Sequence, residues 1–159
     1  MQRPRQLRIL SGVAYGLAML ISGGYCVALS ASTFALALGV AALSTIAGAA
    51  LGYGFGGWYA PTGTERPTFE LVATPLVVSL IAPIIGAFVF LLAGGLASGA
   101  ETGELLWAAP AAVAMTLGYF SVTWPVALGV FALAGLAMAH FSRRGSNNAF
   151  NRTPLRGAG

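Results

Sequence analysis

Ionisable side chains are confined to a few short stretches of this chain, and that distribution limits its possible folds more than any other feature. No Asp, Glu, Lys, Arg or His occurs in residues 9–64 or in residues 71–100. In residues 105–142 the only ionisable side chains are those of His140 and the weak acid Tyr119. A water-soluble protein of 159 residues could not cover its surface with so few charges. We therefore expect lipid to surround most of the chain.

The uncharged stretches are typical of helices rather than strands. Residues 34–43 and 81–92 are apolar on every side, whereas a membrane barrel needs segments of about 10 residues that alternate apolar and polar. A spanning helix needs about 20 apolar residues, so the chain has room for four spans, short loops and two tails. We predict an all-α integral membrane protein in which residues 9–141 form a four-helix transmembrane bundle. The expected spans are residues 9–29, 34–54, 69–97 and 117–141.

All eight basic residues are arginines, and their positions predict how the bundle is oriented. Four spans place every arginine on one side and leave only Glu101 and Glu104 on the other, whereas five spans would divide the arginines evenly. Because positive charges favour the cytoplasmic side, we predict that both chain ends are cytoplasmic. Residues 1–8 would form a basic N-terminus and residues 142–159 a flexible basic tail. The expected cytoplasmic anchors are Arg3, Arg5, Arg8, Arg66, Arg143 and Arg144.

The stretch before the fourth span has two possible placements. A single helix from Leu105 to Phe141 would be about 55 Å long, well beyond a hydrocarbon core of about 30 Å. Residues 105–116 are therefore expected to form either a helical segment at the outer interface or the protruding start of a tilted fourth helix. Aromatic residues favour the two membrane interfaces. The expected interfacial anchors are Trp58, Tyr59, Trp107 and Trp124.

Glycines recur at intervals of four residues in several of the predicted spans. Residues four apart share a helix face, and a pair of small residues there lets a second helix approach closely. The spacing predicts helix-packing seams, within the bundle or toward a partner. The candidate seam residues are Gly12, Gly16, Gly48, Gly52, Gly56, Gly95 and Gly99.

The membrane-embedded part carries almost none of the groups that perform chemistry. The chain has no Lys and no Asp, and its one Cys, one His and four Glu are scattered along the sequence. No nucleophile and base can be paired, and these residues cannot form a metal site. His140 could be an axial haem ligand, but we favour an interfacial residue near the end of the fourth span. We therefore expect neither an enzyme nor a cofactor. The net charge of +4 indicates attraction to anionic lipid headgroups, and no basic face suited to nucleic acid accompanies it.

Two functions remain open from the sequence. The preferred one is a structural or accessory subunit of a larger membrane complex, because a subunit of this kind needs no chemistry of its own. The alternative is a passive channel for a small neutral solute, formed by a homo-oligomer and lined by hydroxyl groups. The hydroxyl candidates are Ser11, Tyr15, Ser22, Ser44, Thr45 and Thr116. Residues 148–156 resemble C-terminal ends found on unrelated bacterial reading frames, which implies a bacterial source and a tail without a role. For a bacterial multi-pass protein we expect the inner (cytoplasmic) membrane.

Overall fold

The computed structural model describes residues 3–29, 34–59 and 68–150, and every regular element within these ranges is a helix. The helices are α1 (Arg3–Leu29), α2 (Phe34–Phe55), η2 (Gly56–Tyr59), α3 (Thr68–Ala97), α4 (Thr102–Leu105) and α5 (Ala108–Phe150). Four of them, α1, α2 continued by η2, α3 and α5, are long and apolar enough to cross a membrane. The prediction of an all-helical membrane protein with four spans is confirmed at this level.

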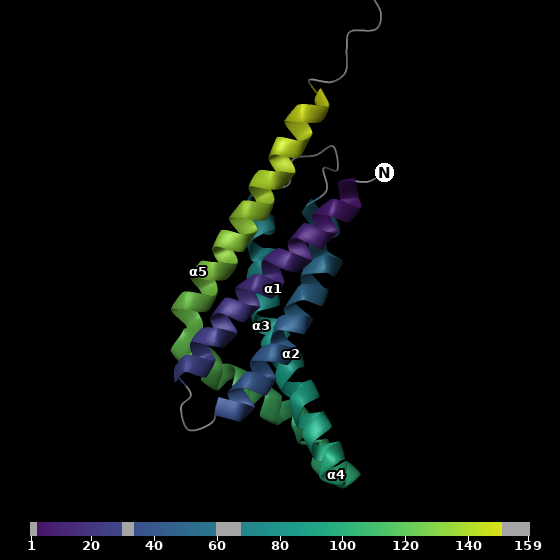
Figure 1. Cartoon of the computed structure of the whole chain (residues 1–159), viewed down its shortest axis with the longest axis vertical. Coiled ribbons are helices and arrows are strands. Elements are labelled where there is room, and N and C mark those ends of the chain that lie inside the picture. Colours follow the sequence, from purple (N-terminus) through teal and green to yellow (C-terminus); the bar gives the residue numbers. More distant parts are fainter. Residues whose placement is uncertain (1–2, 30–33, 60–67, 151–159) are drawn as a thin grey trace, which may run out of the picture.

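The four long helices form a ring in which the chain alternates direction. α1 packs against α2 and α5, and α3 packs against the same two helices from the opposite side. Figure 1 shows that the start of α1 and the end of α5 lie at the same end of the bundle. An even number of spans requires this arrangement. The side of the membrane on which that end lies stays a prediction.

α1 and α2 pack closely because small residues lie on both sides of their contact. A Cβ atom added at Gly12 would lie 3.1 Å from the carbonyl oxygen of Ala49, and one added at Gly16 would lie 3.2 Å from the Ala49 Cβ. Real Cβ atoms rarely come this close to a neighbour. In lipid no hydrophobic force draws helices together, so the stability of this contact depends on packing that small residues permit.

The α2 side of the contact is tighter still. A Cβ atom at Gly48 would lie 2.6 Å from the Met19 Cγ, and one at Gly52 would lie 2.7 Å from the Ser11 carbonyl oxygen. One at Gly56 would collide with the backbone of Arg8. Gly52 and Gly56 therefore bring the two backbones together where any side chain would hold them apart, and Gly48 makes room for the Met19 side chain.

Gly95 and Gly99, which we grouped with the seam glycines, lie at the end of α3 instead. Gly99 has a positive φ of 75°, and its amide donates to Leu96 while the amide of Ala100 donates to Gly95. This pair of hydrogen bonds is the Schellman motif that ends many helices, and it requires the left-handed conformation that glycine adopts without strain. α4 then starts with a capping box between Glu101 and Glu104. Its Leu105 side chain lies where a Cβ at Gly95 would be, at 2.8 Å.

α5 extends beyond the expected fourth span, residues 117–141, at both ends. Its 43 residues correspond to about 65 Å of helix, and residues 108–116 are its first turns rather than a separate helix. Figure 1 shows these turns (green) running across the bottom of the bundle before the helix bends and rises. Pro125 lies inside α5, and an internal proline removes a helix hydrogen bond and kinks the axis. The interfacial depth of residues 105–116 stays a prediction.

The C-terminal end of α5 also differs from our expectation of a tail beginning at residue 142. The helix continues to Phe150, and no proline interrupts the chain before that point. Residues 151–159 of the expected tail lie outside the described residues.

Candidate functional site

A cavity of about 310 Å³ lies among the four long helices. The C-terminal half of α1, the N-terminal half of α2, the middle of α3 and the region of α5 near its bend all contribute to its wall. These segments meet in the half of the bundle that lies away from the N-terminus (Figure 1). Most lining side chains are apolar or small, and none of them is Asp, Glu, Lys, Arg or His.

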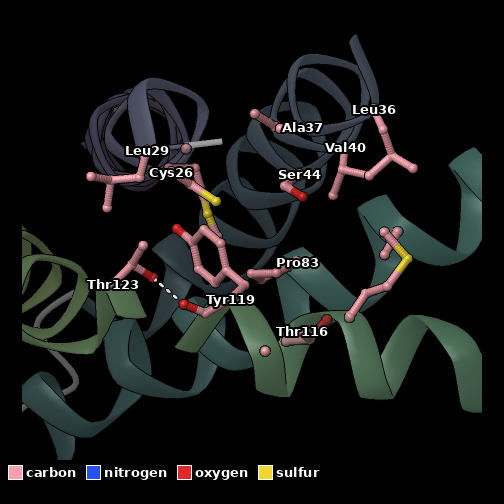
Figure 2. A pocket seen from close by; sticks show the side chains of 16 residues that line it. Cys26, Leu29, Leu36, Ala37, Val40, Ser44, Pro83, Thr116, Tyr119 and Thr123 are labelled. Atoms are coloured by element: carbon pink, nitrogen blue, oxygen red, sulfur yellow. Dashed lines mark hydrogen bonds between the residues drawn. The ribbon is translucent and has the colours of Figure 1, made fainter. Parts of the chain in front are cut away.

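Ser44 of α2 is the polar residue that stands out in this wall (Figure 2). It is 5% exposed, and its Oγ has no hydrogen-bond partner. α3 crosses α2 so closely here that a Cβ atom at Gly86 would lie 2.6 Å from the Ser44 nitrogen. A buried hydroxyl without a partner costs free energy relative to one that is hydrogen-bonded. Ser44 therefore has hydrogen-bonding capacity that the chain itself does not use.

Tyr119 of α5 and Cys26 of α1 form another part of the wall. The Tyr119 side chain interacts with the side chains of Ser22 and Thr123 and lies near Cys26. Figure 2 shows the Cys26 side chain directed toward the Tyr119 ring. The phenol thus connects α1 to the part of α5 near its bend.

The other hydroxyls near the cavity bond to the backbone of their own helices. Thr116 donates to Ala112 over 2.8 Å, and Thr123 donates to Tyr119 over the same distance. Such internal bonds satisfy a hydroxyl in an apolar environment without any pore or ligand. Of the six hydroxyl residues that we expected to line a channel, Ser44 and Thr116 line the cavity. The remaining four are outside its wall: Ser11, Tyr15, Ser22 and Thr45.

The half of the bundle nearer the N-terminus is filled by large side chains. Tyr15 of α1, Tyr59 of η2 and Phe131 of α5 are all 1% exposed or less. The hydroxyls of Tyr15 and Tyr59 are hydrogen-bonded to each other, and the rings of Tyr15 and Phe131 lie 6.3 Å apart at 52°. Ser142 of α5 donates to the Tyr59 carbonyl oxygen. We call Tyr15, Tyr59 and Phe131 the aromatic cluster.

The cavity does not continue through this cluster. Met19 lines the cavity, belongs to the same buried core as the aromatic cluster, and lies against Gly48. A solute that crossed one copy of the chain would have to displace Met19 and the aromatic cluster. The arrangement is therefore a partly open pocket confined to one half of the bundle, and it is suited to holding a molecule.

Three of the four aromatic anchors predicted from the sequence are on the surface. Trp58, Trp107 and Trp124 are 48%, 72% and 54% exposed. The Trp58 ring packs edge-on against Phe55. Tyr59 differs from our expectation, because it is 1% exposed and its hydroxyl points into the bundle toward Tyr15 rather than to the headgroups.

The predicted arginine anchors are described only in part. Arg5 and Arg8 are exposed in the first turns of α1, and the Arg8 guanidinium lies over Gly57 of η2. The side chains of Arg3, Arg143 and Arg144 and the whole of Arg66 lie outside the described residues. Arg5 and Arg8 therefore share the end of the bundle at which the aromatic cluster begins.

Sequence reasoning missed Gly86 and Gly39 as packing residues. A Cβ at Gly86 would collide with Ser44, and one at Gly39 would collide with the Phe90 ring, so both glycines allow close contact between α2 and α3. Neither belongs to a pair spaced by four residues, which is why the search for such pairs passed over them. Gly23 was missed as well, although it follows Gly16 by seven residues and so faces the same way.

Candidate metal ligands do not gather anywhere in the part of the chain that the structure describes. No group of three or more His, Cys, Asp or Glu residues lies close enough there to hold a metal ion. His140 is exposed on α5, beside the ring of Phe141.

No known protein family, curated protein or solved structure matches the chain.

Proposed function

We propose that the protein is a non-catalytic accessory subunit of a larger complex in the bacterial inner membrane. The observation that carries this proposal is the outward face of α2. Only 17% of the most apolar stretch of α2 is buried within the chain, and this is the smallest share among the four spans. α2 packs closely against α1 and α3, but the side of the helix that faces away from both is uncovered and free for a partner.

The residues on this face support a helix rather than lipid as the neighbour. Ala42, Ile46, Ala50 and Gly54 are all exposed and recur every four residues, so they share one side of the helix. Gly54 has no atom within 4 Å of the place where its Cβ would lie. Lipid chains have no need of small residues, whereas a packed helix does. We infer that a transmembrane helix of a different polypeptide covers this face.

Purification from native membranes in a mild detergent tests the proposal. The tagged protein should be recovered with a second polypeptide in fixed stoichiometry. Ala50→Phe should abolish that recovery, because the bulky ring fills the space that the partner helix needs. Leu133→Phe is the matched control, since Leu133 is 67% exposed on α5 and its replacement should leave the complex intact.

Two results would contradict the accessory-subunit proposal. Recovery of the chain alone, unchanged by Ala50→Phe, would leave α2 without a partner. Recovery of a symmetric homo-oligomer that increases solute flux into liposomes would instead favour the passive channel.

The orientation of the bundle is proposed from the positions of its arginines. Arg5 and Arg8 are exposed at the end of the bundle where α5 also ends, and arginines favour the cytoplasmic face. We therefore infer that both chain ends are cytoplasmic. Single cysteines introduced at Gln6 and at Gly103 in a Cys26→Ser background should label differently with a membrane-impermeant maleimide in intact cells. Gly103 should react and Gln6 should not, and the reverse pattern would invert the orientation.

A further inference from the structure

We propose that the cavity between α1, α2, α3 and α5 is a binding site for a small uncharged molecule with an apolar body and one hydroxyl or carbonyl group. In this site the Ser44 hydroxyl makes the hydrogen bond to the ligand. The proposal does not depend on whether the protein is an accessory subunit.

The size of the cavity sets the size of the ligand. Apolar cavities of about 150 Å³ in proteins bind one benzene ring. A cavity of about 310 Å³ therefore accommodates roughly two fused rings or a branched chain of similar bulk. It is too small for a whole membrane lipid.

The lining sets the charge and polarity of the ligand. No charged residue lines the cavity, and transferring an ion into such surroundings without a partner is very costly. A neutral molecule avoids this cost, and its apolar body replaces empty space with contacts to side chains such as Leu29, Leu36 and Val40.

The position of Ser44 determines where the hydroxyl or carbonyl group of the ligand would lie. The Oγ has no partner, is almost fully buried and packs against Gly86 of α3. It reaches an occupant by changing its side-chain rotamer, and no internal hydrogen bond opposes that change. Thr116 and Thr123 already donate hydrogen bonds to their own helix backbones and offer less hydrogen-bonding capacity to a ligand. A ligand hydroxyl or carbonyl near Ser44 would satisfy the one lining hydroxyl that the described chain leaves unsatisfied.

Cys26 provides a reporter for occupancy, because it lines the cavity and is the only cysteine in the chain. The rate at which N-ethylmaleimide alkylates Cys26 can be followed by mass spectrometry on the full-length protein in lipid nanodiscs. The probes are 1-naphthol, naphthalene and 1-naphthalenesulfonate. At about ten times its dissociation constant, 1-naphthol should slow alkylation about tenfold, since about a tenth of the sites stay open.

The other two probes test the chemistry of the site. Naphthalene should bind about fivefold more weakly than 1-naphthol because it lacks the hydrogen-bonding group. The sulfonate should give no protection, because its charge cannot be buried there. Equal protection by all three probes would show a general effect on the membrane and would overturn the proposal.

Two pairs of variants separate the cavity from the rest of the chain. Val40→Phe fills the cavity and should remove protection by 1-naphthol, whereas Leu38→Phe, which is 51% exposed on the same helix, should preserve it. Ser44→Ala should reduce the affinity for 1-naphthol to that for naphthalene. Thr45 does not line the cavity, and its hydroxyl donates to the Ala41 carbonyl oxygen. Thr45→Val should therefore leave both affinities unchanged.

Three results would refute the site. The first is alkylation of the wild-type protein that no probe slows. The second is equal 1-naphthol affinity in the wild type and in Ser44→Ala. The third is a phospholipid retained by the wild type but not by Val40→Phe in native mass spectrometry, since a lipid chain would then be the occupant.

Discussion

The two halves of the bundle solve the packing problem of a membrane protein differently. Near the N-terminus, glycines on α1 and α2 bring the backbones together and the aromatic cluster fills the remaining core. In the opposite half, α5 bends and the same helices surround a cavity. The comparison teaches that glycine contacts alone do not fill a core. Large side chains must meet between the helices as well, and Tyr15, Tyr59 and Phe131 do so in only one half.

The largest effect should come from breaking the closest contact of the filled half. In Gly52→Leu the new side chain would begin 2.7 Å from the Ser11 carbonyl oxygen and 2.8 Å from the Tyr15 ring. Neither neighbour can move freely, so we expect the free energy of unfolding to fall by about 3 kcal/mol. Unfolding by sodium dodecyl sulfate, followed by far-UV circular dichroism, measures this change.

Gly54→Leu is the matched control on the same helix. No atom lies within 4 Å of the added Cβ there, and leucine favours helix more than glycine does. The variant should be as stable as the wild type or more so. Equal destabilisation by both substitutions would mean that the glycine contacts do not hold α1 and α2 together.

The next largest losses of stability should come from shortening one core side chain in each half of the bundle. Phe131 is fully buried beside Tyr15, and Phe131→Ala should cost about 2 kcal/mol. This is less than in a water-soluble core because the unfolded helices remain in lipid. Val40 borders space that is already empty, so Val40→Ala should cost about 0.5 kcal/mol or less. If Phe131→Ala and Val40→Ala lowered the free energy of unfolding by similar amounts in the same experiment, the two halves would not differ in how well their cores are packed.

A smaller effect is expected from the hydrogen bond within the aromatic cluster. Tyr15→Phe and Tyr59→Phe each remove one of the two bonded hydroxyls and should each cost about 1 kcal/mol. Because both remove the same bond, the double variant should cost about as much as either single one. Additive losses in this double-mutant cycle would show that the two hydroxyls act independently.

The number of spans could be predicted from the sequence because it depends on local composition. Uncharged stretches of about 20 residues must lie in lipid, and lipid requires helices. The continuation of α5 through residues 108–116 and 142–150 could not be settled in this way. Helix ends depend on caps and breaks, and the chain offers no proline between Pro125 and Pro154 to end the helix.

The candidate site could not be predicted from the sequence, because it depends on how the helices are placed around one another. Ser44 was one of six equivalent hydroxyl candidates. Ser11 and Ser44 both lack a hydrogen-bond partner for their buried hydroxyls, and only Ser44 lines the cavity. Tyr59 had been grouped with the surface aromatics because it follows the expected second span, residues 34–54, in a loop rich in Gly and aromatic residues. Its burial depends on Tyr15, which is 44 residues away in sequence. Four-residue spacing also did not distinguish Gly52, at a helix contact, from Gly99, at a helix end.

The smallest expected effect has the opposite sign and arises in the half with the cavity. Ser44→Ala removes a buried hydroxyl that has no hydrogen-bond partner, so the folded state no longer bears the cost of burying it. We expect the free energy of unfolding to rise by about 0.5 kcal/mol in the absence of ligand. Ser79→Ala is the control, because the equally buried Ser79 Oγ donates to Leu76 over 2.7 Å and its removal should bring no gain. A loss of stability in Ser44→Ala would mean that the hydroxyl has a partner in the membrane, and the cavity would then lack the unused polar group on which ligand recognition depends.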